Sequence, residues 1–370
     1  MTIERLFFEL LRVTVGNRSQ LSASPSTEEW ISLRQMADKQ SLTGIVLHGI
    51  ERLPKEQRPP QNLLLDWIGH SMMIRQRNSQ TTAVCKKLVD IFCQEGYTPC
   101  ILKGQANHAY YGKEIGTLRI CGDIDIWVVS HQGNNEKENV SRVLKYVYET
   151  FPVESLCWLH VELKPVDSVP VEIHLRPSFF NSPLRNRRFQ KYLDFEKAVC
   201  QKTIDGISLP ALKKEYDIIF QLNHMFRHLL DEGIGLRQVV DYYFLLTSDE
   251  QYQKKDIQKI IKALGMWKFA RALMYVMDEV LGLTHDKMLC KPSEKDGRFL
   301  LSEIMEAGNF GHYDARMASL DVKKEHFSYQ IKHTWRRIKR NVRFLSSYPE
   351  EVIWEPVARC RHWIWKLRNN

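Results

Sequence analysis

Apolar residues recur at helical spacing through the first 95 residues of the chain. In the last part of this region Val84, Leu88 and Phe92 form one stripe, and Gly96 can end a helix there. The polar residues between them are typical of a helix with one buried face. The pattern therefore predicts an N-terminal helical region over residues 1–95.

Residues 96–205 have a different pattern, in which short apolar runs alternate with short helical segments. Two alternating runs joined by "PVDS" predict a β-hairpin. The predicted strands are 97–104, 122–130, 156–164 and 169–176, and the predicted helices are 105–112 and 136–150. This β-α-β-α-β-β order predicts a small mixed sheet with helices packed against it.

Helical spacing returns in the C-terminal part of the chain. The segment 213–230 has an apolar face that includes Ile218 and Phe226, a second helix is predicted for 236–247, and further helices follow. We therefore predict a C-terminal helical domain over residues 206–370. The predicted fold class is α+β, with a mixed-sheet core flanked by two helical regions.

The composition is typical of a globular protein, with 370 residues of which 44% are hydrophobic and 26% charged. No apolar run approaches the ~20 residues needed to span a bilayer. The N-terminal segment carries Glu4 and Glu9 inside its apolar stretch, which is unlike a signal peptide. Eight dispersed cysteines without a C-x-x-C motif predict reduced thiols. We therefore expect a cytoplasmic protein with no membrane partner, and the sequence leaves the oligomeric state open.

The net charge is +9, and "KHTWRRIKRNVRF" at 332–344 holds six of the basic residues. Basic residues interleaved with aromatic ones can bind a phosphate backbone. Alternatively, the segment is a solvated helix whose Trp335, Ile338 and Val342 point into a core, at i, i+3 and i+7. We favour the solvated helix.

Candidate chemistry gathers in the predicted sheet. Asp123 and Asp125 in "RICGDIDIWVV" face the same side of a strand, where two carboxylates repel each other unless a cation lies nearby. Lys103 and Gly104 lie between a strand and a helix, where a phosphate can approach the backbone. Glu172 is a third carboxylate in an apolar strand. Three carboxylates on neighbouring strands beside such a turn predict a site for one or two Mg²⁺ ions.

The ordered motifs "LKG", "Y…R-x-x-x-D-I-D" and "V-E-I-H" resemble the uncharacterised nucleotidyltransferases of the DNA polymerase beta superfamily. The resemblance is tight over residues 99–176 and looser over the flanking helices. It implies transfer of a nucleoside monophosphate from an NTP, such as ATP, with Mg²⁺ or Mn²⁺ and release of pyrophosphate. The acceptor stays open among a small molecule, a sugar phosphate, a protein side chain and an RNA end.

The resemblance assigns a role to particular residues. Asp123, Asp125 and Glu172 would be the metal ligands, and Glu172 could also activate the acceptor. The residues implied at the nucleotide are Lys103, Gly104, Arg119, His174, His224 and Arg237. A polar line over Asp217, Gln221, His224 and His228 would form a wall of the substrate cleft or, alternatively, a solvated helix face.

Two departures from the family pattern bear on activity. Most of the superfamily has Gly-Ser at the turn, whereas this chain has Gly104-Gln105, and its third carboxylate is Glu where many members use Asp. The alternative function is therefore a catalytically inactive nucleotide- or RNA-binding protein of the same fold. If the hairpin turn centres on Asp167, Glu162 pairs opposite Glu172 and His160 pairs opposite His174.

Overall fold

The computed structural model describes residues 2–133, 135–309 and 340–369. The N-terminal elements are α1 (Ile3–Thr14), α2 (Thr27–Lys39), α3 (Thr43–Arg52), the 3₁₀ turn η1 (Lys55–Gln57) and the long α4 (Gln61–Gln94). The Ser26 side chain accepts a hydrogen bond from the Glu29 amide, and the Glu29 carboxylate accepts one from Ser26, so a capping box begins α2. Gly96 follows the end of α4 with a φ of +77°, as predicted, because glycine adopts this left-handed conformation at low cost.

A seven-stranded mixed sheet in the order β3-β4-β5-β2-β1-β7-β6 forms the centre of the molecule. Its strands are β1 (Thr98–Ile101), β2 (Ile124–Val129), β3 (Val153–Leu156), β4 (His160–Val166), β5 (Val169–His174), β6 (Val199–Ile204) and β7 (Ile207–Leu212). The predicted α+β class with a mixed sheet is confirmed. The sequence had not indicated β3, β6 or β7, and β7 lies beyond the boundary that we placed at residue 205.

The two faces of the sheet are covered by different helices. Ile126 of β2 packs in one core with Phe92 of α4 and with α7 (Glu136–Thr150), whose bounds match the prediction. Trp127, the next residue of β2, belongs to the other core, which contains the C-terminal helices. Because side chains alternate along a strand, Asp125 lies on the same face of the sheet as Trp127, which packs with the C-terminal helices.

Eleven further helices belong to the described fold. They are η2 (Gly104–Asn107), α5 (His108–Tyr111), α6 (Lys113–Gly116), α8 (Pro183–Tyr192), α9 (Phe195–Ala198), α10 (Lys214–Asp231), α11 (Leu236–Thr247), α12 (Lys254–Ala263), α13 (Trp267–Leu281), α14 (Glu294–Ala307) and α16 (Pro349–Asn369). The predicted apolar face of α10 is buried, including Ile218 and Phe226. Over the described ranges, no helix combines the length and apolar character needed to cross a membrane.

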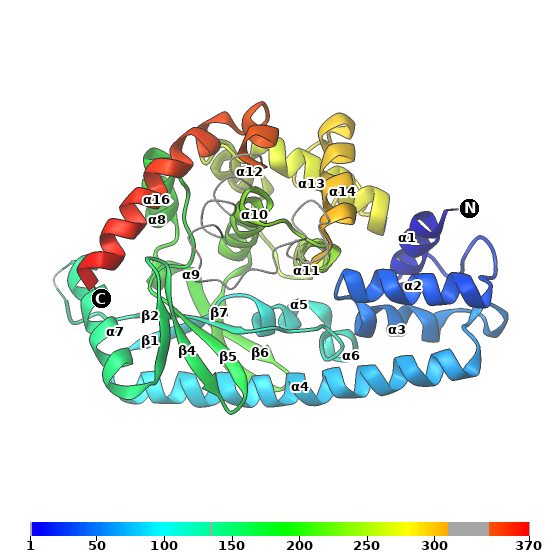
Figure 1. Ribbon diagram of the computed structural model, residues 1–370, viewed down its shortest axis with the longest axis horizontal. Helices are drawn as coiled ribbons and strands as arrows, with labels where there is room; N and C mark the ends of the chain where they lie inside the picture. The colour runs from blue at the N-terminus through cyan, green and yellow to red at the C-terminus, as the bar shows by residue number, and fades with distance from the viewer. Residues whose placement is uncertain (1, 134, 310–339, 370) are drawn as a thin grey trace, which may run out of the picture.

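The N-terminal and C-terminal helices share one apolar core, although they are far apart in the sequence. Leu10 of α1 and Trp30 of α2 belong to the same buried cluster as Phe220 of α10. The Arg12 guanidinium donates hydrogen bonds to the carbonyl oxygens of Asp278 and Glu279 at the end of α13. α4 then runs along one side of the molecule from the N-terminal helices to the sheet (Figure 1).

Most of the basic segment, residues 332–339 with Trp335 and Ile338, lies outside the described residues. Where the chain is described again, Arg340 is buried and donates two hydrogen bonds to the Leu229 carbonyl oxygen. Val342 is 64% exposed, so its predicted core position is wrong. Phe344 is fully buried instead, so Phe344 and not Val342 occupies the core position of this helical segment.

Candidate active site

A β-hairpin brings the acidic and imidazole side chains together. Asp167 and Ser168, at the turn between β4 and β5, both have positive φ, at 48° and 65°, as two-residue hairpin turns require. The register pairs Glu162 with Glu172 and His160 with His174, which confirms the predicted alignment. The four side chains therefore lie on one face of the hairpin.

Parallel pairing of β2 with β5 places the three carboxylates side by side. Asp125 is the register partner of Glu172, and Asp123 directly precedes β2 on the same face. One oxygen from each of these three side chains lies within 4.8 Å of the others. Carboxylate oxygens at this spacing are suitable ligands for a hard divalent cation.

Two cationic side chains neutralise this acidic cluster. The Lys103 ammonium lies 2.9 Å from Asp125 Oδ2 and 4.0 Å from Asp123 Oδ2. His174 Nε2 lies 2.9 Å from Asp125 Oδ1 and 3.2 Å from Glu172 Oε2. The aspartates tolerate each other because this lysine and this histidine lie between the carboxylates.

The charges of the cluster follow from these contacts. Burial raises the pKa of Asp125, but attraction by Lys103 and the hydrogen bond from His174 outweigh it and hold that pKa below its usual range. Burial likewise opposes ionisation of Glu172, yet the hydrogen bond from His174 and the charge of His160 lower its pKa to about 2. Burial alone would lower the pKa of His174, but Asp125 and Glu172 raise it to about 9. At neutral pH both carboxylates are therefore ionised and His174 is an imidazolium.

A narrow cleft with an internal volume of about 30 Å³ opens beside Asp123. Its lining includes five of the residues implied at the nucleotide, which are Lys103, Gly104, Arg119, His224 and Arg237. Gly104 has a φ of +61°, and a Cβ there would lie 3.4 Å from the Asp123 carbonyl oxygen. Glycine therefore allows the tight turn that places the backbone against the cleft.

Arg119 lines the cleft, but its guanidinium is held by other protein groups. Its Nε and Nη2 donate to the two oxygens of Asp241 at 2.6 and 2.7 Å, and the Tyr111 hydroxyl donates to the same carboxylate. All three residues are buried. Arg237, on the same helix as Asp241, donates to the Ile120 carbonyl oxygen at 2.8 Å. The pair Arg119–Asp241 thus fixes the loop before β2 against α11.

The polar line of α10 is buried over its first half, so the solvated-face alternative is wrong there. The Asp217 carboxylate accepts a hydrogen bond from the Tyr110 hydroxyl, and Gln221 donates to the Asn107 side chain and to Asp217. Gln221 and His224 line the cleft. Burial and the positive charges around it hold the pKa of His224 well below its ordinary value, so this ring is neutral.

Gln105, which replaces the serine of the family pattern, points away from the cleft. Its amide donates to the Asn78 carbonyl oxygen, to the Thr82 hydroxyl and to Asp205. The side chain at this position therefore ties the turn to α4 and supplies no group to the cleft.

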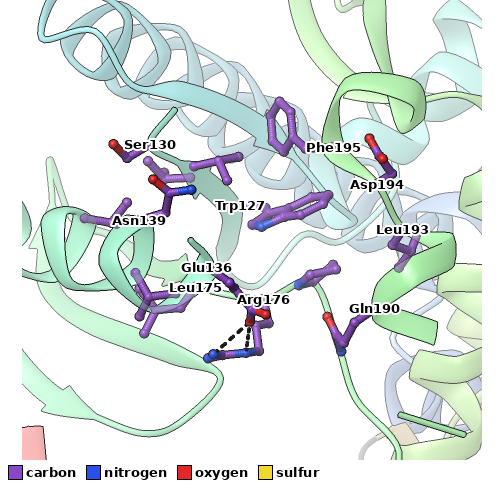
Figure 2. A pocket seen from close by; sticks show the side chains of 15 residues that line it. Trp127, Ser130, Glu136, Asn139, Leu175, Arg176, Gln190, Leu193, Asp194 and Phe195 are labelled. Carbon is purple, nitrogen blue, oxygen red and sulfur yellow. Dashed lines mark hydrogen bonds and ion pairs between the residues drawn. The ribbon is translucent and has the colours of Figure 1, made fainter. Parts of the chain in front are cut away.

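A second hollow, of about 400 Å³, lies at the end of β2 (Figure 2). Trp127 and Phe195 form its aromatic part, with ring centroids 4.7 Å apart, and Arg176 pairs with Glu136 at its border. Trp127 is the register partner of His174 and lies two residues after Asp125 on the same face of β2, so this hollow begins next to the acidic cluster. The alternation of side chains along β2 is enough to predict that Trp127 lies on the same face as Asp125. No local pattern in the sequence predicts that Phe195 packs against Trp127.

Comparisons with known proteins identify the family of the chain. The sequence model of a family described as uncharacterised nucleotidyltransferases matches residues 26–282, which is more than half of the chain. Among solved structures, the chain is similar to an antigenic nucleotidyltransferase-like protein from Paracoccidioides brasiliensis, with 14% identity, a TM-score of 0.32, and coverage of 55% of this chain and 92% of that chain. No curated protein matches the chain significantly. The family match includes the sheet, the acidic cluster and the cleft, and the chain belongs to this family of uncharacterised nucleotidyltransferases.

Proposed function

We propose that the protein transfers a nucleoside monophosphate from an NTP to an acceptor hydroxyl or phosphate, with Mg²⁺ or Mn²⁺ held by Asp123, Asp125 and Glu172. The observation that carries the proposal is the spacing of one oxygen from each carboxylate, within 4.8 Å of the others, beside a cleft. Such a metal neutralises phosphate charge and stabilises the attacking and leaving oxygens of an in-line displacement.

Lys103 links the metal-free cluster to substrate binding. Its ammonium pairs with Asp125, and it also lines the cleft. With a divalent cation bound to the aspartates, the ammonium would be available to bind the triphosphate as a point charge. Gly104 lets the backbone approach the same phosphates.

In this proposal the nucleotide binds at the cleft, whose lining includes residues of α10 and α11. His224 is neutral and half-buried at its wall, so it can exchange hydrogen bonds with a base or ribose without adding charge. Arg237 adds a cation at the same wall. Arg119 acts indirectly. Its guanidinium is held by the Asp241 carboxylate, and this pair positions the loop that carries Asp123.

Glu172 acts as a ligand in this proposal. A carboxylate with a pKa of about 2 is a weak base, so it is a poor acceptor for the proton of the attacking group. Catalysis then depends on positioning and on charge neutralisation. The hollow beside Trp127 lies next to His174 on the strands and offers the acceptor a place to bind.

The test is incubation of the purified protein with Mg²⁺ and each α-labelled NTP, in the presence of protein, RNA or small-molecule fractions as acceptors. Label on one acceptor class supports the proposal and names the acceptor. Tight NTP binding without transfer to any fraction indicates the inactive nucleotide-binding alternative, which the orientation of Gln105 away from the cleft favours.

A further inference from the structure

Two imidazole rings converge on one oxygen of Glu172. His160 Nδ1 lies 3.3 Å from Glu172 Oε2, and His174 Nε2 lies 3.2 Å from the same atom. One ligand atom from each of the three residues lies within 4.8 Å of the others. The register makes this possible, because His160 and His174 are directly paired and Glu172 is two residues before His174.

These separations fit a transition metal. A tetrahedral Zn²⁺ ion with bonds of about 2.0–2.1 Å to nitrogen and oxygen keeps its ligand atoms roughly 3.3 Å apart. The two nitrogen–oxygen distances are 3.2 and 3.3 Å before any metal is considered. An ion could therefore bind on this side of Glu172 with little movement of the backbone.

The outer nitrogen of His174 has a hydrogen-bond acceptor, and that of His160 faces Glu162. The inner nitrogen of His174 hydrogen-bonds to Asp125 and Glu172, so a metal ion would displace its proton and take the place of the contact with Asp125. His174 Nδ1 donates to the Arg176 carbonyl oxygen at 3.2 Å, which directs the lone pair of the neutral ring to Nε2. His160 Nε2 lies 3.9 Å from Glu162 Oε1, which is beyond hydrogen-bond distance, and the Ser155 hydroxyl donates to the other oxygen of that carboxylate. Metal-binding histidines almost always donate a hydrogen bond from the outer nitrogen, as His174 does here, and Glu162 is the acceptor nearest to the outer nitrogen of His160.

The group also has a route from solvent. The His160 side chain is 19% exposed and lines a groove formed with Trp158, Phe179 and His362. Asp123, by contrast, lines the cleft, which shares no lining residue with this groove. An ion can therefore approach His160 without passing through the cleft.

We propose that His160, Glu172 and His174 form a second metal site that binds a divalent transition metal such as Zn²⁺. Imidazole nitrogen favours Zn²⁺ and Co²⁺, whereas a site made only of carboxylate oxygens favours Mg²⁺. The two sites share Glu172, so a transition metal would fix the carboxylate that the proposed transfer needs. The proposal itself rests on the histidine geometry and holds whether or not the protein transfers nucleotides.

Co²⁺ tests the site directly, because it replaces Zn²⁺ and absorbs visible light strongly when tetrahedral. Metal-free protein is titrated with Co²⁺ in a large excess of Mg²⁺, without nucleotide. We expect one Co²⁺ per chain, displaced by Zn²⁺ and unaffected by Mg²⁺. His160→Asn should abolish the absorption, and Glu162→Gln should weaken binding by about 10–100-fold, since it removes only the outer partner.

Two further variants act as controls. His131 is a 45% exposed histidine outside the cluster, so His131→Asn should bind Co²⁺ as the wild type does. Asp123→Asn should keep Co²⁺ while losing Mg²⁺-dependent NTP binding, which separates this site from the proposed active site. Thermal unfolding establishes whether each variant is folded. If His160→Asn does not fold, Glu162→Gln provides the test.

The proposal is overturned if the wild type binds no Co²⁺ in excess Mg²⁺, or if His160→Asn and Glu162→Gln both bind it as tightly as the wild type. If Mg²⁺·NTP binding persists while Co²⁺ fails to bind, only the second metal site is wrong. If Co²⁺ binds but no nucleotide does, the proposed function fails and the histidine site stands.

Discussion

The ammonium of Lys103 lies 2.9 Å from the carboxylate of Asp125, which is 1% exposed, so the charged group at the end of β1 is neutralised by the aspartate of the neighbouring strand. His174 completes the arrangement from the other side of the same carboxylate. The aspartate that we propose as a metal ligand therefore also stabilises the protein without metal.

The two aspartates should consequently differ in their effect on stability. Asp125→Asn leaves Lys103 and His174 without their shared carboxylate and should cost about 3–5 kcal/mol. Asp123→Asn removes the charge of a side chain that is 39% exposed and 4.0 Å from Lys103, so this substitution should lower the free energy of unfolding by less than about 1 kcal/mol. Urea unfolding with EDTA present measures both values. Equal losses of stability would contradict the role given to Asp125.

The pH dependence of stability should reflect His174. Asp125 and Glu172 raise the pKa of this ring from 6.5 to about 9, so the folded state holds the proton more tightly than the unfolded state does. The resulting stabilisation is complete below pH 6.5 and is lost as the pH rises through about 9. His108, whose pKa is also about 9 beside Cys121 and Asp205, contributes in the same range.

Unfolding free energies between pH 6.5 and 9, measured with EDTA present, test this pH dependence. His174→Asn should reduce the slope of stability against pH and leave the part that comes from His108. The assignment is wrong if the variant keeps the full slope of the wild type.

Arg119 should matter for folding more than for phosphate contact. Arg119→Lys keeps the charge but cannot donate two parallel hydrogen bonds to Asp241, so it should cost about 1.5–3 kcal/mol. Arg142 lies on the exposed side of α7, and Arg142→Lys should change stability by less than about 0.5 kcal/mol. Thermal and urea unfolding give both values. A fully stable Arg119→Lys protein with poor NTP binding would instead support direct contact with the triphosphate.

Glu172 should be essential to both metal sites. Glu172→Gln keeps the size of the side chain and removes its charge, and it should reduce metal affinity and turnover by at least about 10–100-fold. NTP binding should survive better than turnover, because Lys103 and Gly104 still line the cleft. Glu154→Gln, at an exposed position of β3, is the matched control and should leave both unchanged. Normal activity of Glu172→Gln would refute the three-carboxylate mechanism.

Local pattern was sufficient for much of the fold and for the acidic cluster. The hairpin itself follows from alternation and from the turn at Asp167 and Ser168. The pairing of Glu162 with Glu172 also depends on a register shift between Leu163 and Val166. Pairs distant in sequence had no local signal, as with Arg119 and Asp241. β7 was missed because Pro210 lies inside it, and proline is unusual in a strand that has neighbours on both sides.

The proposed chemistry is tested most directly by comparing the amount of pyrophosphate released with the amount of label transferred to the acceptor. Wild-type protein with Mg²⁺, an α-labelled NTP and the acceptor fraction should release one pyrophosphate for each label transferred. EDTA should stop both, and Asp123→Asn, which we expect to stay folded, should show neither. Transfer at the wild-type rate by Asp123→Asn, or by the wild type in EDTA, would contradict nucleotidyl transfer at this carboxylate site.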